Sequence, residues 1–107
     1  MRSAASARLA EEALKLIEAG KAKPASSSDI AKSLGCSRQF ADRCLTRVCG
    51  KTLRALMEDA RMGEAKRRLD DGASVREIVA GMQFSSANQF YRIYKRYFGK
   101  TIRQSAK

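Results

Sequence analysis

Residues 30–54 read IAKSLGCSRQFADRCLTRVCGKTLR, and residues 78–103 read IVAGMQFSSANQFYRIYKRYFGKTIR. Each stretch starts with isoleucine, has an apolar residue followed by serine six positions later, and ends in Gly-Lys-Thr, an aliphatic residue and arginine. The offset is 48 residues from Ile30 to Ile78 and 49 residues from Gly50 to Gly99. We interpret the two stretches as an internal repeat whose second copy carries one extra residue near the start of its longer segment.

Each copy is predicted to fold as a short helix, a tight turn and a longer helix, which is the helix-turn-helix plan. A serine before each longer segment favours an N-cap, at Ser37 in the first copy and at Ser85 or Ser86 in the second. The longer helices are expected to end near Cys49 and Phe98, because a glycine follows each of these residues.

The longer helix of each copy sorts its residues into an apolar stripe and a polar stripe at helical spacing. The stripes predicted to face the core are Ala41, Cys44, Leu45 and Val48 in the first copy and Phe90, Ile93, Tyr94 and Tyr97 in the second. The polar stripes carry side chains suited to the base edges of the DNA major groove. We predict base contacts from Gln39, Asp42, Arg43, Thr46, Asn88, Tyr91, Arg92 and Lys95.

These side-chain types match the donors and acceptors that bases present. Arginine can bridge two acceptors of guanine, and asparagine or glutamine can pair with adenine. Asp42 can accept from cytosine, or it can instead hold Arg43 or another neighbour in place. Tyr91 can offer its hydroxyl or press its ring on a thymine methyl. Contacts to the DNA phosphates are predicted from Ser37, Arg38, Arg47, Ser86, Arg96 and Lys100.

The rest of the chain also has helical spacing and capping signals. A first helix is expected over about 3–19, with Leu9, Ala13, Leu16 and Ile17 on its apolar face, and a linker helix over about 53–69. Serines 26–28 with Asp29, and Ser74 with Glu77, offer capping boxes. A frayed turn over 102–107 completes an all-α fold of about seven helices. We divide it into a first helix-turn-helix subdomain (1–52), the linker helix (53–69) and a second helix-turn-helix subdomain (70–107).

The composition favours a polyanionic partner and argues against catalysis. The 107 residues carry a net charge of +11, and residues 78–107 contain six basic residues and no acidic one. Nucleic acid is the leading partner, an anionic membrane surface is the second, and a generic solvated surface is the third interpretation. The sequence has no histidine and no Gly-rich phosphate loop, and its three cysteines form no C-x-x-C pair. We therefore expect no enzyme activity, no metal, no cofactor and no membrane-spanning segment.

Residues 26–103 resemble the DNA-binding domain of the AraC/XylS family of bacterial transcription regulators. The resemblance implies two helix-turn-helix motifs joined by a long helix, reading successive major-groove segments on one DNA face. This chain departs from the family at Gln83, where glycine is usual and a left-handed backbone carries a steric cost, and at Ile102, where proline is usual. The matching positions are Ile30, Ala31, Leu34, Gly35, Ser37, Arg43, Gly50, Arg61, Ala65, Leu69, Ile78, Phe84, Ser85, Phe90, Arg92, Tyr94, Lys95, Phe98 and Gly99.

The function that we predict is sequence-specific regulation of bacterial transcription by a cytoplasmic protein associated with the nucleoid. The partners would be double-stranded DNA and RNA polymerase, and the DNA-binding unit would be a monomer. Two alternatives stay open: a sequence-nonspecific architectural protein that binds nucleic acid, and a helical module that binds proteins. Competition by scrambled duplex distinguishes the first, and an absence of DNA affinity at low salt would indicate the second. The sequence does not decide between a stand-alone regulator and part of a larger one, and we favour the latter.

Overall fold

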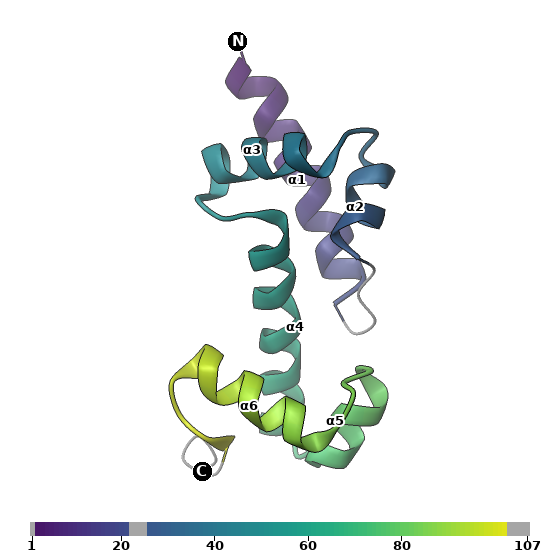
Figure 1. Cartoon of the computed structure of the whole chain (residues 1–107), viewed down its shortest axis with the longest axis vertical. Helices are drawn as coiled ribbons and strands as arrows, with labels where there is room; N and C mark the ends of the chain where they lie inside the picture. The colour runs from purple at the N-terminus through teal and green to yellow at the C-terminus, as the bar shows by residue number, and fades with distance from the viewer. Residues whose placement is uncertain (1, 22–25, 103–107) are drawn as a thin grey trace. The chain divides into compact units, whose positions relative to one another are not determined.

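The computed structural model describes residues 2–21 and 26–102, and this part of the chain is built of helices without strands (Figure 1). The all-α prediction is confirmed. Six helices are described, and the part of the predicted seventh turn that follows Ile102 lies outside the described residues. The helices are α1 (Arg2–Ala19), α2 (Ser27–Ser33), α3 (Arg38–Cys49), α4 (Leu53–Asp70), α5 (Val75–Gly81) and α6 (Ala87–Phe98).

Local capping chemistry explains where these helices begin and end. Ser26 and Ser74 form complete capping boxes with Asp29 and Glu77, as predicted. The hydroxyls of Ser37 and Ser86 accept the backbone N–H groups of the third helical residues, each at 3.1 Å. The repeat is therefore confirmed in detail: α2 and α5 have 7 residues each, and α3 and α6 have 12 each.

The extra residue of the second copy is located by its N-cap. In the first copy Cys36 precedes the capping serine directly, whereas in the second copy Ser85 lies between Phe84 and the cap Ser86. The backbone N–H of Ser85 donates to the side-chain oxygen of Gln89 at 2.9 Å. The inserted residue thus has its own hydrogen-bond partner on α6, one turn into the helix.

The described contacts divide the chain into two compact units, Met1–Arg61 and Met62–Lys107. Each unit has its own hydrophobic core, and α4 supplies residues to both. In the first unit Leu53 is fully buried, with Leu56, Met57 and Ala60 packed beside the core. The second core takes Met62, Ala65 and Leu69 from α4. The apolar residues of α4 therefore serve the first core in its N-terminal half and the second core in its C-terminal half.

The core of the first unit combines alanines with isoleucine and leucine, and the alanines come from α1, α2 and α3, which contact one another. Two expectations are wrong here. Leu16 on α1 is 37% exposed, and Val48 on α3 is 45% exposed. In the last turn of α3, Cys49 rather than Val48 packs against the core. The buried residues of this core are Ala10, Ala13, Ile17, Ile30, Ala31, Ala41, Leu45 and Leu53.

Aromatic side chains fill the core of the second unit. Phe90 and Tyr94 on α6 are 0% and 1% exposed, as the apolar stripe predicted. Phe90 packs against Phe84 with a centroid separation of 4.8 Å, and Tyr94 packs against Phe98 at 4.5 Å. Both separations lie in the range that favours tilted aromatic pairs. These successive ring contacts anchor α6 to Phe84, which lies in the turn before the helix.

A buried carboxylate joins two arginines on α4 in the second unit. Glu64 is 5% exposed and accepts hydrogen bonds from Arg67 (Nε 3.0 Å, Nη2 2.7 Å) and from Arg68 (Nε 2.8 Å). These donors lower the pKa of the Glu64 carboxyl from 4.5 to about 2. Arg68 Nη1 lies 3.1 Å from where a Cβ on Gly81 would stand, so this guanidinium lies beside the last residue of α5.

The turn between α5 and α6 is strained at Gln83. Its φ of 59° is left-handed, and it is the only non-glycine residue with a positive φ among the described residues. Gly35 holds the matching place in the first copy, with a φ of 75°. A side chain in this conformation brings Cβ close to a backbone carbonyl, which costs about 1–2 kcal/mol. The resemblance to the family implied either a left-handed residue at Gln83 or a turn that opens differently, and the left-handed conformation is the one observed.

Replacing Gln83 by glycine should therefore stabilise the protein. We expect Gln83→Gly to raise the free energy of unfolding by about 1 kcal/mol, because relief of the strain exceeds the extra chain entropy of glycine. Urea denaturation followed by circular dichroism measures this change. The reverse substitution at the matching turn, Gly35→Gln, should lower it by about as much, since a Cβ there meets no atom within 4 Å and only the backbone is strained. Equal midpoints for wild type and Gln83→Gly would contradict the strain.

Candidate nucleic-acid interface

The polar stripe of α3 is exposed over three of its four predicted base-reading residues. Gln39, Arg43 and Thr46 are exposed, whereas Asp42 is half-buried. The buried face of the same helix, formed by Ala41, Cys44 and Leu45, holds it against the first core. The helix thus presents a fixed row of donors and acceptors to solvent, which is what direct reading of a major groove needs.

The side chain of Asp42 has a structural role that the repeat did not reveal. Its Oδ1 accepts the backbone N–H of Leu53 at 2.9 Å. Leu53 is the first residue of α4, where N–H groups lack partners within the helix and negative charge is favoured. The hydroxyl of Thr52 accepts a second of these groups, the N–H of Ala55, at 3.2 Å. Asp42 therefore holds the start of α4 in place. The sequence had offered this kind of role, holding a neighbour, as the alternative to a base contact.

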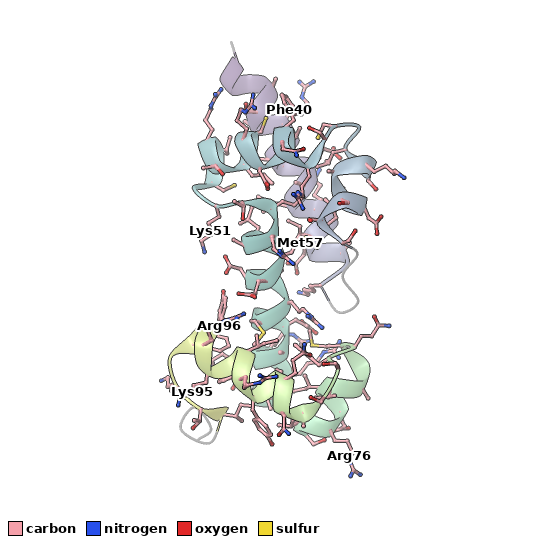
Figure 2. The ribbon with its side chains drawn as sticks, viewed as in Figure 1. Phe40, Lys51, Met57, Arg76, Lys95 and Arg96 are labelled. Atoms are coloured by element: carbon pink, nitrogen blue, oxygen red, sulfur yellow. The ribbon has the colours of Figure 1, made fainter. Side chains whose placement is uncertain are left out.

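The polar stripe of α6 is fully exposed. Asn88, Tyr91, Arg92 and Lys95 all lie on the outer surface of the helix, and Tyr91 is 47% exposed despite its aromatic ring. Figure 2 labels Lys95 on this helix. Tyr91 occupies the place that Asp42 has in the first copy, and its exposure leaves the ring and hydroxyl accessible. The residues of the two stripes therefore occupy matching positions of the repeat, but their side chains differ in type.

The six predicted phosphate-binding residues are also exposed. Ser37 and Ser86 cap their helices, so their hydroxyl oxygens already accept one N–H each, while the hydroxyl protons stay available to a phosphate oxygen. These caps place the N-termini of α3 and α6 beside the serines, where anions are favoured. The exposed cations of this set are Arg38, Arg47, Arg96 and Lys100.

Acidic side chains neutralise several cations in and beside the linker helix. Lys51 pairs with Asp59 at 2.6 Å and Lys66 with Asp70 at 3.3 Å, while Glu64 and Asp71 neutralise Arg67 and Arg68. Within residues 2–21 and 26–102, by contrast, no ion pair or side-chain hydrogen bond engages Arg38, Arg43, Arg47, Arg92, Lys95 or Lys100. Their charge is available to an external anion.

Other kinds of site lack support among the described residues. No group of three or more potential metal ligands occurs there. The described helices include none whose length and hydropathy would suit a membrane crossing. The three cysteines are unpaired, and burial raises the pKa of the Cys36 thiol, which disfavours the reactive thiolate.

Comparison with known proteins identifies the type of domain. A family model described as a helix-turn-helix domain matches residues 30–107, which includes most of α2 and all of the helices that follow. The match leaves α1 outside the family region. Neither the curated proteins nor the solved structures give a significant match to the chain.

Proposed function

The chain belongs to the AraC/XylS-type family of helix-turn-helix DNA-binding domains of transcription regulators, and from this premise we propose that it reads DNA with both α3 and α6. Each helix would lie in one of two successive major-groove segments on the same DNA face. The observation that carries the proposal is the pair of exposed polar stripes at matching positions of the repeat, with cations that no described acid neutralises.

The division of roles follows from side-chain chemistry. Arg43 and Arg92 would each bridge guanine, while Gln39 and Asn88 would pair with adenine. Thr46, Tyr91 and Lys95 would complete the base contacts, and Asp42 would orient α3 by holding α4. The capping serines and the outer cations would bind phosphates and set the register without reading sequence. This second set is Ser37, Arg38, Arg47, Ser86, Arg96 and Lys100.

The same proposal extends to organisation and partners. We propose subdomains over 1–52 and 70–107 with a linker helix over 53–69, so that a single chain can occupy a bipartite site as a monomer. RNA polymerase is the further partner that regulation of transcription requires. The family is one of DNA-binding domains rather than of enzymes, and its partner would place this protein at the nucleoid in a bacterial cytoplasm.

Selection from randomised duplexes tests the two-helix reading. We expect Arg43→Ala and Arg92→Ala each to relax preference at one base pair by about 1–3 kcal/mol, because each arginine would make a bidentate contact to guanine. The two affected positions should lie about 10 base pairs apart, one helical turn. The matched control is Arg76→Ala, which removes an exposed arginine from α5 and should leave the selected sequence unchanged (Figure 2).

The outcomes separate the proposal from its alternatives. Recovery of the wild-type sequence by both variants would contradict readout by these arginines. Binding without any preferred sequence in the wild-type chain would instead indicate an architectural protein, because phosphate contacts alone weaken or strengthen all duplexes alike.

A further inference from the structure

A groove of about 360 Å³ lies in the first unit between the start of α1 and one side of α3. From α1 it is lined by Ala5, Ser6 and Leu9, and from α3 chiefly by Phe40 and two arginines. Figure 2 labels Phe40 on α3. The groove lies on the flank of α3, between the polar stripe of this helix and the face that packs against the first core.

The floor of the groove is apolar. The hydroxyl of Ser6 points to Cys44, with its oxygen 3.7 Å from Sγ, so the polar group of this buried serine has a partner inside the protein. Leu9 is half-buried, and Phe40 is 48% exposed although it is the largest apolar side chain on α3. Water against these two surfaces is released when an apolar ligand replaces it.

Two cations stand at the rim. Arg43 and Arg47 are one helical turn apart on α3, so their side chains are neighbours. Neither has an ion pair or hydrogen bond in the part of the chain that the structure describes. Two adjacent guanidinium groups beside an apolar floor complement a ligand with an anionic head and a flat apolar body.

We propose that this groove binds a small aromatic carboxylate. Its ring would lie between Leu9 and Phe40, where an offset arrangement on the Phe40 ring is favourable, and its carboxylate would accept hydrogen bonds from Arg43 and Arg47. A neutral analogue of the same shape would lose the charge-assisted part of this binding. The site is defined by unit 1 alone and does not depend on DNA.

Occupation of the groove affects DNA binding, and this step rests on the proposed function. Arg43 lies on the border between the groove and the polar stripe, so a carboxylate bound there engages an arginine that would otherwise read guanine. Ligand and DNA then compete for one side chain, and each lowers the affinity of the other by the same factor. We expect this factor to be about tenfold.

Titration of the whole 107-residue chain with 2-naphthoate, followed by NMR, tests the site. At the binding efficiency of drug-sized ligands, a probe of about 13 non-hydrogen atoms should have a Kd of about 1 mM. The amide signals of Leu9 and Phe40 should shift along one saturable curve, and 2-naphthamide should bind at least about tenfold more weakly.

A matched pair of variants locates the site without touching the arginines. Ala5 and Ala7 are both exposed on α1, but only Ala5 lines the groove. Ala5→Phe should fill the groove and abolish the shifts, whereas Ala7→Phe should bind 2-naphthoate as the wild type does. In fluorescence anisotropy at constant total ionic strength, saturating 2-naphthoate should weaken binding of the selected duplex about tenfold in the wild type and in Ala7→Phe, but not in Ala5→Phe.

Each outcome bears on one of the two proposals. Absence of saturable binding, equal binding of the amide, or unchanged binding by Ala5→Phe would overturn the groove site and leave DNA reading untouched. Naphthoate binding without any change in DNA affinity would overturn the competition at Arg43. A chain that binds naphthoate but no duplex would overturn the proposed function and leave the groove site standing.

Discussion

The affinity of this chain for duplex DNA is expected to fall about 10³- to 10⁵-fold between about 50 and about 200 mM salt. The proposed interface uses about 6 to 10 phosphate contacts, and each neutralised phosphate releases counterions on binding. The logarithm of the association constant should therefore fall linearly with the logarithm of salt concentration, with a slope of roughly −5 to −9. Fluorescence anisotropy with a labelled duplex at several salt concentrations measures this slope.

Two lysines provide a matched test of which cations contribute. Lys100 is exposed and has no ion-pair partner among the residues described, so Lys100→Ala should make the slope shallower by about one and leave sequence preference intact. Lys66 already pairs with Asp70 at 3.3 Å, so Lys66→Ala should leave the slope unchanged. A wild-type slope near zero would remove DNA as the polyanion and support the protein-interaction alternative.

The second large effect is expected in the aromatic core. Phe90 is fully buried between Phe84 and Tyr94, so Phe90→Ala should lower the free energy of unfolding by about 3–5 kcal/mol through lost burial and the cavity left behind. That loss is comparable to the whole stability of a small domain, so the second unit should unfold.

Tyrosine near-ultraviolet circular dichroism reports on this unit selectively, because all three tyrosines of the sequence, residues 91, 94 and 97, lie in it. Phe40→Ala is the control, since Phe40 is 48% exposed on α3 and its loss should change stability by about 0.5 kcal/mol or less. A tyrosine signal that persists in Phe90→Ala with an unchanged melting temperature would contradict the assigned core.

Helix boundaries could be predicted from the sequence because the chemistry that sets them is local. The capping serines lie within three residues of the N–H groups that they accept, and glycine closes α3 and α6 in left-handed conformations. The linker helix was predicted over 53–69 and is observed over Leu53–Asp70. The left-handed turn at Gln83 could likewise be expected, because the resemblance to the AraC/XylS family implies a glycine at this position.

Contacts between distant residues could not be predicted in the same way. The sequence left Asp42 open between a base contact and a neighbour, and it could not identify that neighbour, because Leu53 lies eleven residues away on another helix. Leu16 and Val48 fit the apolar stripes of their helices, but both side chains are exposed. Their burial depends on which other helix packs against that turn, and helical spacing alone does not give this. The base contacts themselves stay a prediction, because they are defined only when DNA fills the groove.

The Glu64 bridge on α4 also contributes to how the protein's stability responds to acidity. A carboxyl whose pKa is lowered from 4.5 to about 2 on folding adds stability above pH 4.5, and this contribution is lost as the pH falls toward 2. The sequence has no histidine, the side chain that ordinarily changes charge between pH 5 and 8. Arginine and lysine keep their positive charge throughout that range, so the electrostatic attraction to DNA is maintained while the surrounding solution turns moderately acidic.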